Sequence, residues 1–86
     1  MPYATQPNVS LTTAWTAVVA GSADVFIQNL GSDTVFVSIG SSAPAQGAID
    51  GNQIPRNGNW SFTGMTSETV YARAGSTSGS ISVTKG

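Results

Sequence analysis

The sequence predicts a small all-β fold, either an antiparallel β-sandwich or a jelly-roll-like barrel of about seven to nine short strands. Three observations predict this class. Runs rich in Val, Ile, Phe, Thr and Trp alternate with clusters of Gly, Asn, Asp, Ser and Pro at intervals of about 8–12 residues. No segment has sustained helical periodicity. The chain has only 86 residues, which is enough for a single domain.

The first element is an extended N-terminal arm, residues 1–8. It contains two prolines and no alternation of apolar and polar residues, so we expect it to become ordered only against a neighbouring molecule. Residues 9–86 form the single predicted β-sandwich domain. Its expected strands span residues 9–13, 15–20, 23–29, 34–39, 47–49, 52–54, 59–63, 68–74 and 79–84.

The turns between these strands are specified by their residue types. Asp50 and Gly51 suit a two-residue hairpin turn, whose central positions need a positive φ. Residues 55–58 read Pro-Arg-Asn-Gly, and we expect Pro55 to fix the first corner and Gly58 to supply the left-handed residue. Residues 75–79 read Gly-Ser-Thr-Ser-Gly, which predicts a flexible link between the last two strands.

Alternation assigns the side chains of the two central strands to opposite faces. Val25 and Ile27 share one face, and Phe26 lies on the other; in the next strand Phe36 lies opposite the aliphatic residues. If these strands form a hairpin around Gly31, matching their aliphatic faces sends Phe26 and Phe36 together to the second face. Two aromatic rings there form a protein interface, a ligand platform, or a cluster covered by the chain's own arm or loops.

The strand near the C-terminus offers a second candidate contact. Tyr71 and Arg73 point away from Val70 and Ala72, and Tyr and Arg are enriched among the residues that dominate protein interfaces. The alternative is an ordinary surface role, because an outward Arg covers apolar surface with its stem and keeps its charge in water. The candidate interface residues are therefore Phe26, Phe36, Tyr71 and Arg73.

Composition argues against several classes of function. Four acidic and three basic residues give a net charge of −1, so the chain cannot form the basic patch that nucleic-acid binding needs. No segment is apolar enough to predict a membrane span, and the N-terminus lacks the pattern of a signal peptide, so we expect synthesis in a cytoplasm. Without Cys or His, disulfides and transition metals cannot supplement a thin core, which leaves self-association or docking onto a partner as the expected source of extra stability.

Catalysis lacks its usual residues in this sequence. His and Cys are absent, and the only lysine, Lys85, is the second-last residue. Asp24 and Asp33 flank one strand and so lie too far apart for a pair of glycosidase carboxylates. We therefore expect no enzymatic activity, no catalytic residue, no metal site and no cofactor.

Six segments of the chain share a pattern with known proteins: residues 25–29 (Val-Phe-Ile-Gln-Asn), 35–40 (Val-Phe-Val-Ser-Ile-Gly), the turn at Ala43 and Pro44, residues 58–62 (Gly-Asn-Trp-Ser-Phe), 70–74 (Val-Tyr-Ala-Arg-Ala) and 81–84 (Ile-Ser-Val-Thr). Together these segments resemble the small all-β structural proteins encoded in the particle-assembly regions of tailed bacteriophages. The resemblance implies a virion protein that decorates the capsid or forms part of a head fibre or tail. Its implied partners are its own copies, in a homotrimer, and a major capsid or other virion protein.

A second function class stays open beside the structural one. Sugar-binding sandwiches place aromatic rings beside Asp, Asn or Arg, and Trp15, Trp60 and Tyr71 are candidates for such rings. The alternative is therefore a carbohydrate-binding or adhesin module at a fibre tip. Exposure of Trp60 would favour sugar binding, and its burial would favour the scaffold.

Overall fold

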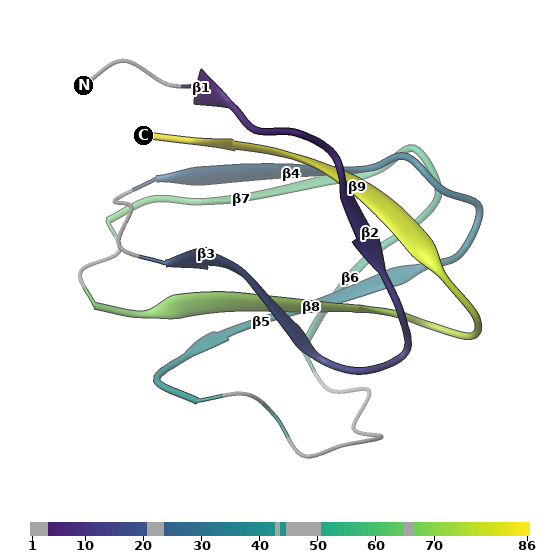
Figure 1. Ribbon diagram of the computed structural model, residues 1–86. Helices are drawn as coiled ribbons and strands as arrows, with labels where there is room; N and C mark the ends of the chain where they lie inside the picture. Colours follow the sequence, from purple (N-terminus) through teal and green to yellow (C-terminus); the bar gives the residue numbers. More distant parts are fainter. Residues whose placement is uncertain (1–3, 21–23, 43, 45–50, 65–66) are drawn as a thin grey trace.

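The computed structural model describes residues 4–20, 24–42, 44, 51–64 and 67–86, and these residues form nine strands (Figure 1). The strands are β1 (Ala4–Thr5), β2 (Val9–Leu11), β3 (Thr16–Ala20), β4 (Val25–Asn29), β5 (Val35–Gly40), β6 (Asn52–Ile54), β7 (Asn59–Phe62), β8 (Thr69–Ala74) and β9 (Gly79–Lys85). The described residues include no helix long and apolar enough to cross a membrane. The predicted all-β class is confirmed.

The strands follow the winding of one long antiparallel hairpin. Its tip is the β5–β6 pair, and behind the tip β4 pairs with β7, β3 with β8, and β2 with β9. The hairpin is folded over on itself, so that β9 also pairs with β4 and β8 also pairs with β5. This winding is that of a jelly roll, one of the two predicted architectures.

Two sheets result from the winding and form the two layers of Figure 1. In the first sheet, β1 and β2 both pair with β9, which is followed by β4 and then β7. In the second sheet the order is β3, β8, β5 and β6. Strands β2 to β9 lie close to their expected bounds, whereas the expected strand at 47–49 lies outside the described residues.

The core lies between the sheets and follows the predicted alternation. Val25 and Ile27 point inward from the first sheet, and Val35 and Val37 point inward from the second. Burial of each such side chain contributes about 1.5–3 kcal/mol. Among the residues that the structure describes, the buried cluster consists of Leu11, Val19, Val25, Ile27, Val35, Val37, Ile54, Val70, Ala72, Ala74, Ile81 and Val83.

The predicted hairpin between β4 and β5 is wrong. The two strands belong to different sheets, so residues 30–34 cross from one layer to the other instead of turning back within one sheet. Alternation fixes which side chains face the core, but a five-residue loop can equally span the roughly 10 Å between packed sheets. Phe26 and Phe36 therefore point outward from opposite sheets and do not share a face.

The turn at residues 55–58 forms as predicted but differs in detail. The Gly58 N–H donates to the Pro55 carbonyl at 2.8 Å, and the left-handed residue is Asn57, with φ 64°, rather than Gly58. Gly58 is needed for a different reason, since a Cβ there would lie 2.9 Å from the Cδ of Pro55. In the other predicted turn Gly51 has φ 106°, as expected, and Asp50 lies outside the described residues.

Part of the N-terminal arm pairs within the chain. Ala4 and Thr5 pair with Lys85 and Thr84 of β9, and the Gln6 N–H donates to the Val83 carbonyl at 2.8 Å. The expectation that the arm becomes ordered only against a neighbour is therefore wrong for these residues. Side-chain alternation did not reveal the strand because both β1 side chains are exposed and the pairing uses backbone groups.

Asn29 is the one completely buried polar residue among those that the structure describes. Its Nδ2 donates to the carbonyls of Asp33 at 2.7 Å and Ile54 at 3.0 Å, and its Oδ1 accepts the Gly31 N–H at 3.0 Å. Ile54 belongs to β6, so this amide links the first sheet to the second. It also fixes both ends of the segment that crosses between them.

Replacing Asn29 with Ala is expected to lower the free energy of unfolding by about 2–3 kcal/mol, because buried carbonyls and an N–H lose their partner. Urea unfolding followed by circular dichroism measures the change. Gln28→Ala is the control, since its side chain lies on the other face of β4, and it is expected to change stability by less than about 0.5 kcal/mol. Equal effects of the two changes would contradict a special role for Asn29.

Deleting residues 1–8 is expected to leave a folded domain, because β1 contributes only two exposed residues to the sheet. Thermal unfolding of the truncated chain tests this expectation. A truncated chain without a cooperative transition would make β1 an integral strand of the domain.

Candidate functional site

Asp33 has a structural role that its position between two strands did not reveal. One carboxylate oxygen accepts the Thr77 N–H at 2.9 Å, the Thr77 hydroxyl at 3.1 Å and the Ser78 N–H at 3.3 Å. The Thr77 N–H is the main cause of a lowered Asp33 pKa, with the Ser76 hydroxyl next, against a smaller opposing effect of desolvation. The predicted flexible link at 75–79 is thus anchored by a carboxylate.

Asp24 lies at the start of β4, where its backbone N–H and carbonyl each bond to Gly86 at 3.2 Å. Its Oδ1 accepts the Gly64 N–H at 3.3 Å. Within the described part of the chain, no three acidic residues gather into a group that could hold a metal ion.

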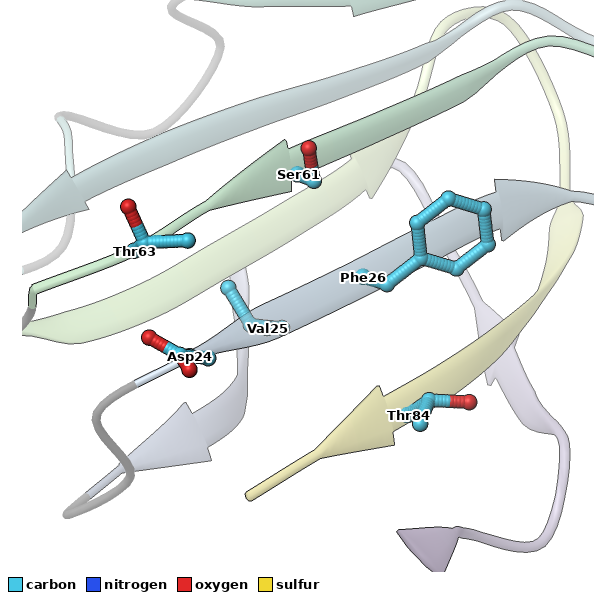
Figure 2. A pocket seen from close by; sticks show the side chains of 6 residues that line it. All are labelled: Asp24, Val25, Phe26, Ser61, Thr63 and Thr84. Carbon is cyan, nitrogen blue, oxygen red and sulfur yellow. The ribbon is translucent and has the colours of Figure 1, made fainter. Parts of the chain in front are cut away.

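Phe26 is the clearest surface feature of the first sheet. It projects from the outer face of β4 with 42% of its surface exposed. Its direct cross-strand neighbours are Ser61 of β7 and Thr84 of β9, so the ring stands between two short hydroxyl side chains (Figure 2). Around it lies an open depression of about 340 Å³, lined by Asp24, Val25, Phe26, Ser61, Thr63 and Thr84.

The rest of this outer face is polar and almost uncharged. Alternation places Gln28 of β4 and Asn59 of β7 beside Phe26, and it places Ser80 and Ser82 of β9 on the same side. We call this surface the Phe26 face, and it consists of Asp24, Phe26, Gln28, Asn59, Ser61, Ser80, Ser82 and Thr84. Its chemistry is one aromatic ring among hydroxyls and amides, with a carboxylate at one end.

The other three predicted interface residues share the outer face of the second sheet. Phe36 lies directly opposite Arg73, and Ser38 opposite Tyr71. Phe36 is only 9% exposed and Arg73 only 6%, and the Arg73 Nε donates to the Ala74 carbonyl at 2.9 Å. Of the four residues, Phe26 alone presents a large exposed apolar surface, and Tyr71 is half-buried.

The aromatic side chains predicted to stack on a sugar are only partly exposed to solvent. Trp15 is buried, and Trp60 is half-buried and packs against the core. Trp60 also stacks on Phe62, with ring centroids 6.2 Å apart and planes at 12°. Phe62 is 43% exposed.

The surroundings of Phe26 could not be found from the sequence. Ser61 and Thr84 lie far from it along the chain, and they become its neighbours only through the pairing of β4 with β7 and β9. Alternation did identify Phe26 itself as outward-facing.

No protein-family model matches the chain, and no curated protein matches it.

Replacing Asp33 with Ala is expected to destabilise the fold at pH 7, because the N–H groups of Thr77 and Ser78 lose their acceptor. Since folding lowers the Asp33 pKa, its stabilisation is present above the ordinary value of 3.8 and is lost as pH falls through the lowered value. Urea unfolding across this range should show the two chains converging in stability at low pH. A constant difference between them would contradict the role of the ionised carboxylate.

Proposed function

We propose that this protein is a non-enzymatic structural component of a virion. It decorates the capsid or forms part of a head fibre or tail, and it contacts another virion protein through the Phe26 face. The observation that carries the proposal is the exposed Phe26 ring at the centre of a sheet face whose other side chains are short, polar and nearly all uncharged. Its partners are its own copies and a major capsid or other virion protein.

The physical properties of the Phe26 face suit protein contact. Interface cores are depleted in charged residues, and one aromatic anchor surrounded by weaker contacts is a common arrangement of binding energy. Short Ser and Thr side chains lose little conformational entropy when a partner covers them. The strands beneath the face are paired on both sides at β4, so the ring is held on a rigid support.

The jelly roll is consistent with this function without deciding it. Viral capsid proteins use the fold, and so do lectins and cupins, so the fold supports more than one class of function. The resemblance of the strand and turn sequences to small structural proteins of tailed bacteriophages favours the virion.

A carbohydrate-binding module is the second candidate, and one observation favours it. The depression beside Phe26 combines an exposed ring with the Asp24 carboxylate and the hydroxyls of Ser61 and Thr84. Aromatic stacking together with such acceptors and donors is the chemistry that recognises a sugar ring. In this case Phe26 replaces the tryptophans as the platform.

Replacing Phe26 with Ser is expected to weaken binding to purified particles by about 10- to 100-fold, because a buried Phe contributes about 1.5–3 kcal/mol. Co-sedimentation of the purified protein with particles of the virus that encodes it measures the loss. Gln28→Ser is the matched control, from the same face of the same strand, and it should bind almost normally.

A glycan array probed with the original protein, Phe26→Ser and Gln28→Ser separates the two candidate functions. Sugar binding that Phe26→Ser abolishes, without any binding to particles, would replace the structural proposal with the carbohydrate one. Normal particle binding by Phe26→Ser would remove the Phe26 face from the proposal.

A further inference from the structure

We propose that β7 is an edge through which two copies of this chain pair, antiparallel to each other, about a two-fold axis at Ser61. The proposal goes beyond the proposed function, since it concerns the free chain and holds with or without a virion partner. It rests on the backbone geometry of β7, on its exposed aromatic side chain, and on its lack of charge.

Among the described residues, β7 is the least protected edge of either sheet. β1 has two residues, and β2 and β6 have three each. β3 is longer, but its register shifts between Ala17 and Val19, and such a bulge disfavours further pairing. β7 has four residues in unbroken register with β4, and within the described chain its other side has no strand beside it.

One hydrogen bond between β4 and the residue before β7 shows which backbone groups of β7 point away from β4. The Asn29 N–H donates to the Gly58 carbonyl at 2.9 Å, next to the residues where β4 and β7 pair. Hydrogen-bonded and non-hydrogen-bonded pairs alternate along an antiparallel ladder, so Trp60 and Phe62 also bond to β4. The N–H and carbonyl groups of Asn59 and Ser61 then point away from β4, toward the open side.

The outward backbone groups of one β7 strand can pair with those of a second β7 strand. When two β7 strands pair with Ser61 opposite Ser61, Asn59 lies opposite Thr63, and the outward groups of each strand meet those of the other. Trp60 then lies opposite Phe62 in the non-hydrogen-bonded positions, where side chains are closest. Phe62 is 43% exposed in the single chain, and this register covers it with an aromatic ring from the second copy.

Charge also favours a second copy as the occupant. Residues 59–64 read Asn-Trp-Ser-Phe-Thr-Gly, so no like charges oppose each other in the pairing. Most natural edge strands carry a Lys, a Pro or a bulge that prevents such contact, and β7 has none of these. The two-fold axis closes the assembly at a dimer, because each copy uses its only β7.

Sedimentation over a range of concentrations tests the pairing on the purified full chain. We expect a species of twice the 8.7-kDa chain mass. Ser61→Pro removes an N–H that points away from β4, so it should leave the fold intact and weaken dimerisation at least about tenfold. Ser61→Val keeps the N–H and should dimerise like the original chain.

A second pair of variants guards against a Ser61→Pro chain that fails to fold. Phe62→Lys introduces a charge beside the axis and should give a folded monomer. Phe26→Lys changes a side chain of nearly equal exposure on the opposite face of the same sheet and should leave the dimer intact. The proposal is overturned by an original chain that stays monomeric, by a trimer such as the resemblance implies, or by equal association of Phe62→Lys and Phe26→Lys.

The register has its own test, because the chain contains no Cys. Residues directly opposite in a hydrogen-bonded pair have Cα atoms about 5.5 Å apart, within the range for a disulfide. Ser61→Cys should therefore form a covalent dimer under mild oxidation, visible on a non-reducing gel, whereas Thr84→Cys on the same face should not. Equal cross-linking of the two variants would overturn the assignment of the axis to Ser61.

Discussion

The buried amide of Asn29 is the interaction on which the arrangement of the two sheets depends. It lies at the end of β4, where the chain leaves the first sheet for the second. Its bonds to Gly31 and Asp33 fix the shape of the crossing segment, and its bond to Ile54 fastens that segment to β6. A buried polar side chain is stabilising only when its groups are paired, and all three bonds here serve the same crossing. The separation of Phe26 from Phe36 follows directly from it.

A second crossing, from β8 to β9, is fastened to the first. The Gly75 N–H donates to the Thr34 carbonyl at 2.8 Å, and the Leu30 N–H donates to the Ser80 carbonyl at 2.9 Å. The Asp33 carboxylate adds its bonds to Thr77 and Ser78. These two of the segments that join the layers therefore hold each other at one end of the sandwich. This mutual support gives a chain without disulfides a rigid end and leaves the outer faces of the sheets free.

The sequence predicted the strands and faces well, and their partners poorly, for a physical reason. Alternation is a local property, so it identified the inward residues and the outward Phe26 correctly. Pairing depends on where a loop goes, and residues 30–34 contain nothing local that distinguishes a hairpin from a crossing. The residues beside Phe36 come from strands far along the chain, and β1 pairs through its backbone together with one bond between the Thr5 and Thr84 hydroxyls. The Phe26 face likewise could not be predicted, because it depends on the pairing of β4 with β7 and β9.

The proposed pairing at the β7 edge and the proposed contact through the Phe26 face can occur in the same assembly. Together they suggest how individually weak contacts could hold the protein on a partner. Residues directly opposite in a sheet lie on the same face, so pairing at Ser61 extends the first sheet across both copies. Both Phe26 rings then point to the same side of one continuous sheet. A partner surface with repeated sites can bind both rings at once, and the second contact forms at high effective concentration. If the protein is the virion component proposed above, paired copies would bind a repetitive particle more tightly through two exposed Phe rings than a monomer through one.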